Sequence, residues 1–379
     1  MDLSLTSDQL LLRQSIREFA EREIRPHVRA WDEAQAYPRT LVDGLGGLGL
    51  MGIQLPEVYG GAAMSSVDYC ICVEELARVD PSVALIVAAH TSLCSNHLYL
   101  AGTDEQKKKY LPKMASGEFV GAIAMSEPGT GSDLQGVRTT AIKKGNRYVL
   151  NGSKTFITNG QHANLIVVVA KTDPKERAKG ISLMVVETGD APGFRRGRKL
   201  KKLGMDSADT SELFFEDVSL PAENLLGTEE GQGFAQLMKE WPQERLIVAL
   251  HAGAMIERAL ALTIDYVKQR EAFGKKIIEF QNTQFELAEC KTEATVAKVF
   301  IDHCIERHIA GQLDTVTASM AKSWATDLLG KIADRCLQLF GGYGYMDEYP
   351  ISRLYRDARV MRIYAGTNEI MKLLIARSL

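Results

Sequence analysis

The segment RYVLNGSKTFITNG, residues 147–160, decides the class of fold. It is short and rich in β-branched and aromatic residues, which is typical of a strand. Three later segments have the same character: ANLIVVVAKT (163–172), GISLMVVET (180–188) and SELFFEDVSL (211–220). Because Gly, Asp and Pro separate these segments, we predict an antiparallel β domain over residues 121–230.

On both sides of this β domain the hydrophobic pattern is helical. Thr6 and Gln9 form a capping-box pattern ahead of apolar residues at helical spacing. The order is helices, strands, helices, without βαβ alternation. We therefore predict an α+β protein with an N-terminal helical domain (1–120), the middle β domain and a C-terminal helical bundle (231–379). The expected longer helices cover residues 66–78, 83–101, 233–269, 281–310, 314–340 and 367–378.

Composition excludes several classes of function. The 379 residues carry 45 Lys and Arg against 48 Asp and Glu, a formal net charge of −3. There is no basic field, so we expect no nucleic-acid binding. The six cysteines form no CxxC pair and the seven histidines no HExxH, so we expect free thiols and no metal site. The start, MDLSLTSDQL (1–10), lacks signal character, and no run of 18 apolar residues occurs; a cytoplasmic protein without a membrane span is expected.

One glycine motif is set aside. GLGGLG (44–49) matches the GxGxxG pattern of dinucleotide-binding folds, and Asp68 follows near the distance expected for a ribose-binding acid. That motif needs a buried strand in front of it, and RTLVD (39–43) is not one. We predict instead a loop where helices approach closely.

Four other stretches combine glycine with hydrogen-bonding or aromatic residues. MSEPGTGSD (125–133) is either a solvent turn or a loop that presents N–H groups to a ligand. In KTFITN (154–159), Phe156 is either core or a cofactor wall. KQREAFGKK (268–276) is either a charged helix end or a clamp for phosphate. QLFGGYGY (338–345) indicates a close approach of the backbone to a flat ligand or to another subunit.

Taken together, these motifs resemble those of the acyl-CoA dehydrogenase family, and the resemblance covers essentially the whole chain. The matching motifs, in the family's order, are AMSEPGTGSDLQG, NGSKTFITNG, KQREAFGK, QLFGGYGYMDEYP and IYAGTNEI. WPQERL (241–246) and AHTSLC (89–94) are similar to the long-chain and isovaleryl-CoA branches. The resemblance implies one FAD per subunit and a homotetramer built as a dimer of dimers.

The resemblance also implies roles for individual residues. The middle domain would line the flavin on both faces, and residues of the C-terminal bundle would bind the FAD of a neighbouring subunit. The implied cofactor-binding residues are Ile123, Ala124, Met125, Ser126, Gly131, Ser132, Phe156, Ile157, Thr158, Arg270, Phe273, Gln281, Gln338, Gly341, Gly342, Thr367 and Glu369. The implied substrate-binding residues are Ser132, Gln243, Arg245, Ala365 and Gly366.

The catalytic base departs from the commonest family pattern. Oxidising an acyl-CoA thioester to the 2,3-enoyl form removes an α-proton, which needs a positioned carboxylate whose pKa is raised by an apolar pocket. Many family members carry this glutamate between the tyrosine and glycine of the IYAGTNEI loop, where this chain has Ala365. In the isovaleryl and long-chain branches the base is a glutamate followed by arginine, here Glu244-Arg245. We predict Glu244 as the base.

The expected function is FAD-dependent dehydrogenation of an acyl-CoA, on long or branched chains, with an electron-transferring flavoprotein as acceptor. Cyclic, aromatic and dicarboxylic acyl groups stay open as alternatives. An acyl-CoA oxidase is less favoured, because typical oxidases of this fold are much longer. A non-catalytic flavin or acyl-CoA binding protein is less favoured because Glu244 is present.

Overall fold

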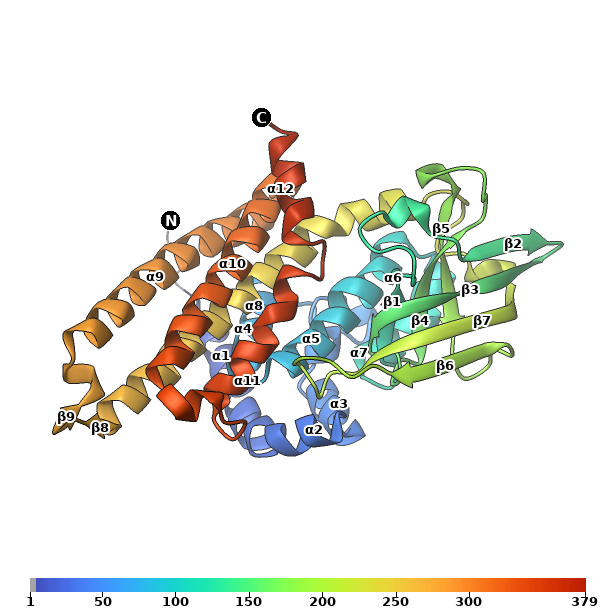
Figure 1. Ribbon diagram of the computed structural model, residues 1–379. Coiled ribbons are helices and arrows are strands. Elements are labelled where there is room, and N and C mark those ends of the chain that lie inside the picture. The colour runs from blue at the N-terminus through green and yellow to red at the C-terminus, as the bar shows by residue number, and fades with distance from the viewer. Residues whose placement is uncertain (1–4) are drawn as a thin grey trace.

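The computed structural model describes residues 5–379. Residues 1–4, part of the segment on which the predicted localisation rests, lie outside the described residues. Helices occupy both ends of the chain, and a twisted sheet lies between them in sequence and to one side in space (Figure 1). The predicted α+β class, with its order of helical, β and helical parts, is confirmed.

The N-terminal part is helical up to Ala115. The predicted capping box at Thr6 and Gln9 is present, and the predicted helix 83–101 is continuous, with one π-helical turn at Thr91–Ser95. GLGGLG lies at the end of a helix and in the turn after it, so the prediction of a loop is wrong. The prediction of a close approach is right, because a Cβ atom at Gly46 would lie 2.2 Å from the carbonyl oxygen of Ser116. The helices are α1 (Ser7–Phe19), α2 (Val28–Ala34), α3 (Arg39–Gly47), α4 (Ser66–Val79), α5 (Pro81–His90), α6 (Asn96–Ala101) and α7 (Asp104–Ala115).

The middle part is a seven-stranded sheet, and it is not wholly antiparallel as predicted. β1 pairs with β4 in parallel, with Gly121 opposite Leu165, and β2 meets β4 in parallel at Thr140 and Lys171. Parallel neighbours need a long connection between them, and the β2–β3 hairpin supplies it between β1 and β4. The strands are β1 (Gly121–Ala124), β2 (Thr140–Lys144), β3 (Arg147–Thr158), β4 (Leu165–Lys171), β5 (Ile181–Glu187), β6 (Phe194–Lys199) and β7 (Thr210–Pro221), in the order β1-β4-β2-β3-β7-β6 with β5 beside β4.

The C-terminal part is built around one long helix, α8, which packs against α4, α9 and α10. The two helical parts share one hydrophobic core, in which Ile16 and Leu76 of the first part join Val248 and Leu329 of the second. The predicted boundaries near residues 120 and 230 fall in the connections on either side of the sheet. The elements are α8 (Gly233–Gln269), β8 (Glu271–Ala272), β9 (Lys275–Lys276), α9 (Gln281–Ile309), α10 (Thr315–Leu339), α11 (Pro350–Ala358) and α12 (Asn368–Ala376).

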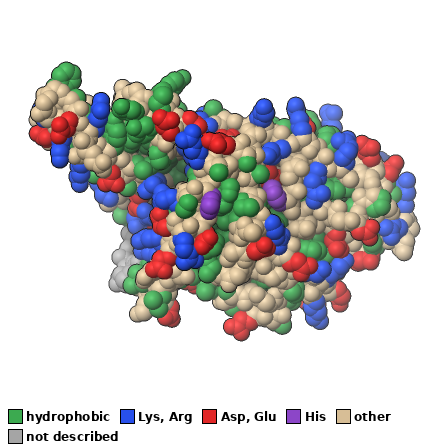
Figure 2. All heavy atoms as spheres, turned by 90° about the horizontal axis from the view of Figure 1, so that it is seen from below, with side chains coloured by type: hydrophobic (Ala, Val, Ile, Leu, Met, Phe, Trp, Pro, Cys, Tyr) green, Lys and Arg blue, Asp and Glu red, His purple; other side chains and the backbone are tan. Residues whose placement is uncertain are grey.

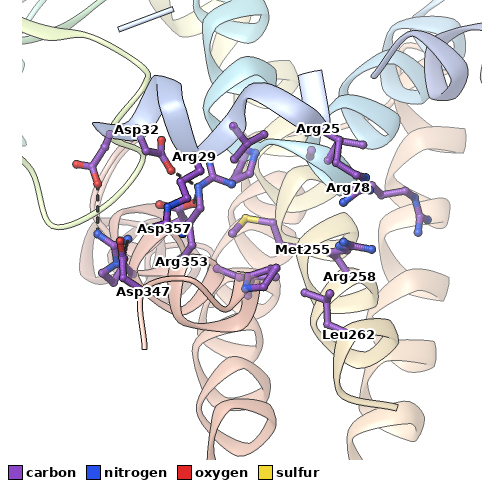
Figure 3. Close-up of a pocket in the computed structure, with 18 of the residues that line it drawn as sticks. Arg25, Arg29, Asp32, Arg78, Met255, Arg258, Leu262, Asp347, Arg353 and Asp357 are labelled. Carbon is purple, nitrogen blue, oxygen red and sulfur yellow. Dashed lines mark hydrogen bonds and ion pairs between the residues drawn. The ribbon is translucent and has the colours of Figure 1, made fainter. Parts of the chain in front are cut away.

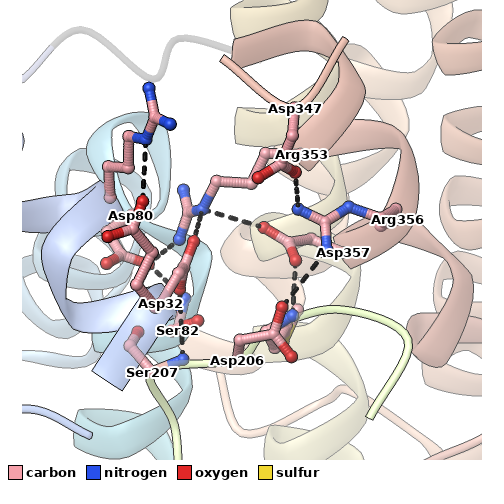
Figure 4. Close-up of polar contacts among 12 residues, drawn as sticks. Asp32, Asp80, Ser82, Asp206, Ser207, Asp347, Arg353, Arg356 and Asp357 are labelled. Atoms are coloured by element: carbon pink, nitrogen blue, oxygen red, sulfur yellow. Dashed lines mark hydrogen bonds and ion pairs between the residues drawn. The ribbon is translucent and has the colours of Figure 1, made fainter. Parts of the chain in front are cut away.

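A buried charge cluster ties the three parts together beside a cavity of about 280 Å³ (Figures 3 and 4). Arg353 of α11 binds Asp32 of α2 and donates to Asp80 at 3.0 Å. Asp357, one turn on, accepts from the N–H of Met205 in the loop before β7. Burial raises the pKa of Asp357 to about 6, against the opposing effect of Arg353. None of the predicted site residues lines this cavity.

Two helical stretches, Pro81–Ala101 and Gly233–Gln269, are long and apolar enough to cross a membrane by length and composition. Most of each lies inside the protein, as core helices do, so they are weak evidence for a membrane span. All six cysteines are free and buried, as predicted. Within residues 5–379 no group of three or more metal-ligating side chains could hold an ion. The face in Figure 2 mixes both signs of charge, without a basic field.

Candidate active site

Helix α8 carries the predicted base. α8 continues through Pro242, and Glu244 lies half-buried two residues later, ahead of the buried run that starts at Arg245. Burial raises the pKa of Glu244 to about 7; the positive charges of Arg245 and Lys322 oppose this, and Glu240 adds to it. A carboxylate with a pKa near neutrality can take up a proton from a carbon acid.

The loop that precedes α12 faces this carboxylate. Tyr364 is close enough to Glu244 for the carboxylate, together with burial, to raise the pKa of the phenol. The next residue, Ala365, has a φ of 55°, and Gly366 has a φ of 82°. Left-handed backbone at a non-glycine residue is uncommon and concentrates at functional sites. The structure therefore brings Glu244 and the loop residues Ala365 and Gly366 into one site.

This loop offers free hydrogen-bond donors. In the described part of the chain, the N–H groups of Ala365 and Gly366 donate to no protein acceptor, and both residues are only half-buried. N–H groups fixed in this way can bind the oxygen of a thioester as negative charge develops on it.

Two neighbours of the base are held by the protein itself. The Arg245 guanidinium lies 5.3 Å from the centre of the Trp241 ring and donates to the Ser319 hydroxyl at 3.3 Å. The Gln243 amide donates to the side-chain oxygen of Gln54 at 3.1 Å. These contacts fix both side chains beside Glu244, which is compatible with their predicted role in substrate binding.

The glycine-rich loop of the middle domain is held by a buried ion pair. Lys154 of β3 donates to Glu127 at 2.9 Å and to the carbonyl oxygen of Met125 at 3.0 Å. Glu127 also accepts from the N–H groups of Arg138 and Thr139. Sequence reasoning misses this pair, because a lysine followed by a threonine carries no signal of burial.

The predicted flavin residues of the middle domain divide by burial. The side chain of Phe156 is 68% exposed with a φ of 59°, beside an irregularity in the β3–β7 pairing. In contrast, Ile157, Ile123 and Ala124 are buried in the cores of the sheet. The side chains of these three residues are therefore not free to contact a ligand. The remaining predicted flavin residues of the middle domain are at least partly exposed: Met125, Ser126, Gly131, Ser132 and Thr158.

A second group of predicted flavin residues lies in the C-terminal part, beside the β8–β9 turn. Arg270, Gln338, Gly341 and Gly342 line a hollow of about 550 Å³. Phe273 is 95% exposed at the β8–β9 turn. This tip lies far from β3 and the sheet in Figure 1. Gln281 begins α9, just after β9.

Two further predicted cofactor residues have structural roles of their own. The Thr367 hydroxyl accepts from the N–H of Ile370 and so caps α12. Glu369 is exposed in the first turn of that helix, where backbone donors and Thr367 lower its pKa. An exposed carboxylate with a lowered pKa is unsuited to act as the base.

The residues present fit a flavin dinucleotide. Cβ atoms built on Gly131, Gly341 and Gly342 would meet no atom within 4 Å, so open space adjoins the backbone at both groups of predicted residues. Arg270 lies 5.4 Å from the ring of Tyr343, and no carboxylate in the described part of the chain pairs with it. Its charge is therefore free for a phosphate.

The site combines a carboxylate of raised pKa, two free N–H groups and two regions of open space that suit a dinucleotide. These features define a flavin-dependent oxidoreductase. The comparisons with known proteins agree. The family models for the N-terminal, middle and C-terminal domains of acyl-CoA dehydrogenase match residues 6–118, 122–218 and 231–379. The chain belongs to the acyl-CoA dehydrogenase family and is an FAD-dependent oxidoreductase.

Relatives differ in the acyl groups that their names give. The mitochondrial long-chain specific acyl-CoA dehydrogenase of Mus musculus is 47% identical, covering 99% of this chain and 87% of that protein. A short-chain specific acyl-CoA dehydrogenase of Clostridium acetobutylicum is 40% identical, covering 99% of each. The mitochondrial isovaleryl-CoA dehydrogenase of Oryza sativa is 40% identical, covering 97% and 90%.

Solved structures agree over nearly the full length. An acyl-CoA dehydrogenase of Geobacillus kaustophilus has a TM-score of 0.96 at 47% identity, covering 100% of this chain and 99% of that one. A chain from work on the electron transferring flavoprotein of Acidaminococcus fermentans has a TM-score of 0.96 at 41% identity, with the same coverage. A glutaryl-CoA dehydrogenase of Mycobacterium smegmatis in complex with FADH2 has a TM-score of 0.93 at 31% identity, covering 99% and 95%.

Proposed function

We propose that Glu244 removes the α-proton of an acyl-CoA thioester in the first half of its oxidation to the 2,3-enoyl-CoA. One observation carries this proposal: a carboxylate with a pKa near 7 faces the loop in which Ala365 stands. Glu369, the other carboxylate of that loop, is exposed and has a lowered pKa. FAD, when bound, supplies the acceptor for the hydride of the β-carbon.

The protein's own groups then stabilise the charge that proton removal creates. The thioester oxygen accepts from the N–H of Ala365, which has no protein acceptor. A fixed donor of this kind is typically worth about 10²–10³ in rate. Glycine suits position 366, because a side chain would be strained at a φ of 82° and its Cβ would lie 2.7 Å from the end of Met371.

Long or branched acyl chains are the proposed substrates. Ala365 leaves room beside the reacting carbons that a glutamate would fill, and relatives include a long-chain and an isovaleryl-CoA enzyme. A relative that is 40% identical is named as short-chain specific, so short straight chains stay among the candidate substrates.

A complete FAD site is proposed to need two subunits. One group of flavin residues lies in the middle domain, around Phe156, and the other lies around Arg270 at the far tip. Within one chain these two groups lie far apart, so in this proposal a neighbouring copy supplies the group around Arg270. This supports an assembly of at least two copies, which the proposed dimer of dimers would supply, and sedimentation of a fully active monomer would contradict it.

The proposed electron acceptor is an electron-transferring flavoprotein. The likeness to a chain from the work on that flavoprotein in Acidaminococcus fermentans supports this choice. Purified enzyme and acyl-CoA should reduce such a flavoprotein at a rate well above that of oxygen consumption. Faster reduction of oxygen would instead identify an oxidase.

An anaerobic titration tests the proposed reaction. Acyl-CoA added to the yellow protein should bleach the flavin absorbance, and mass spectrometry should find the 2,3-enoyl-CoA. A panel with a dye acceptor, comparing straight chains of increasing length with methyl-branched, cyclic, aromatic and dicarboxylic acids, then ranks the acyl groups. Flavin that no member of the panel bleaches would refute the proposal.

A further inference from the structure

A fully buried lysine holds the loop that faces the base. Lys322 of α10 has no exposed surface. Its ammonium donates to the carbonyl oxygen of Gly366 at 2.8 Å and to the side-chain oxygen of Asn368 at 2.9 Å. Asn368 is fixed in turn by Thr326 and Asp327, each at 3.0 Å from its amide nitrogen.

Burying an ammonium group is costly unless its charge is matched. Within residues 5–379, no carboxylate lies within ion-pair distance of Lys322; Asp327 pairs instead with Arg362 at 2.6 Å. Both bonds of Lys322 go to neutral oxygens, one of the loop at Gly366 and one of Asn368 at the start of α12. Lys322 therefore places its charge against the loop and the start of α12 rather than against a carboxylate.

Several charged groups face Lys322 from the elements around it. Glu244 and Arg245 lie on α8, Asp327 on α10 itself and Glu369 on α12. Burial lowers the pKa of Lys322 to about 8, while Asp327 and Glu244 oppose this shift. The group is therefore still charged at neutral pH, and its charge lowers the pKa of Glu244.

We propose that Lys322 is a positioning residue for proton abstraction: it anchors the loop of Ala365 and Gly366 so that the N–H groups of these two residues meet the thioester oxygen. This inference rests on the proposed role of Glu244. The tether acts on the loop geometry, because the carbonyl that Lys322 holds belongs to Gly366. Gly366 carries one of the two N–H donors, and the preceding residue, Ala365, carries the other.

Three substitutions separate the two effects. Lys322→Met removes tether and charge, Lys322→Gln keeps a donor without the charge, and Lys322→Arg keeps the charge. Lys331→Met, at an exposed position on the same helix, is the matched control. FAD content, circular dichroism and the pH profile of kcat/KM are measured for each variant and for Glu244→Gln.

The expected results are specific to positioning. The Met variant should lose about tenfold to a hundredfold in kcat with little change in KM, as expected when a fixed donor is misplaced. The acidic limb of its pH profile should move up by about one pH unit, because a nearby positive charge is gone. The Gln variant should share the shift, and the Arg variant should lack it.

Each other outcome overturns the inference. Folded Lys322→Met protein with wild-type kcat and an unmoved acidic limb would show that the lysine has no part in the reaction. Loss of FAD and fold in both the Met and Gln variants would show that it serves folding alone. Failure of the proposed function is distinguishable, since wild-type protein would then lack dehydrogenation, or Glu244→Gln would keep it.

Discussion

Replacing Glu244 with Gln is expected to make the folded protein more stable. Burial raises the pKa of Glu244 from about 4.5 to about 7, and each pKa unit corresponds to about 1.36 kcal/mol. Because the side chain is only half-buried, water screens part of this difference. We expect Glu244 to cost about 1–2 kcal/mol of folding free energy when it is ionised.

The sign of this cost depends on pH. The folded state binds the Glu244 proton more tightly than the unfolded state does, so the cost is absent below pH 4.5, grows between pH 4.5 and 7, and is constant above. The neutral Gln lacks it. The variant should therefore melt slightly higher than wild type at pH 8, by roughly 1–3 °C, and within error of wild type at pH 4.5.

Differential scanning calorimetry at both pH values, with equal protein concentration and excess FAD, measures this difference, because ligand and subunit concentration also shift Tm. Glu229→Gln, at an exposed position, is the control for removal of a charge. A Tm at pH 8 equal to or below that of wild type would refute the placement of Glu244 in a desolvated site.

Three further predictions follow from the site. The double change Glu244→Gln with Ala365→Glu should recover part of the turnover lost in the single variant while losing branched substrates, as measured with the dye assay on straight and branched acyl-CoA. Arg270→Ala should weaken FAD retention by removing a charge-assisted contact to phosphate, which equilibrium dialysis would show as a higher Kd. Glu127→Gln leaves Lys154 without its ion-pair partner and should cost about 3–5 kcal/mol, seen as a large drop in Tm and in FAD content; an unchanged Tm would contradict the role given to this pair.

Local pattern is enough to predict much of the fold. The capping box at Thr6, the long helix that contains Glu244 and the β character of residues 147–160 depend on neighbours in sequence. The parallel pairing of β1 with β4 cannot be predicted this way, because Gly121 and Leu165 are brought together by the whole sheet. Short helices such as α2 and α11 lack the long apolar period that identifies a helix from its sequence.

The residues of the candidate site likewise differ in whether their sequence neighbours are enough to predict them. The apolar neighbours of Glu244 in WPQERL are enough to indicate a raised pKa. Lys322 carries no such signal, since a lysine within a helical pattern is normally exposed. Ile157 belongs to the predicted flavin residues, yet its side chain alternates into the sheet core. Burial of this kind depends on which face of an element is covered.

The most direct test of the central claim is hydrogen exchange at the α-carbon. An acyl-CoA analogue with sulfur in place of the β-carbon has no β-hydrogen to give up, so it reports on proton removal without oxidation. Incubated in D2O with the FAD-loaded wild-type protein, it should gain deuterium at the α-carbon, followed by mass spectrometry. With Glu244→Gln the exchange should fall by about 10²–10⁴-fold while the analogue still binds. Exchange at the wild-type rate in that variant would contradict the assignment of Glu244 as the base.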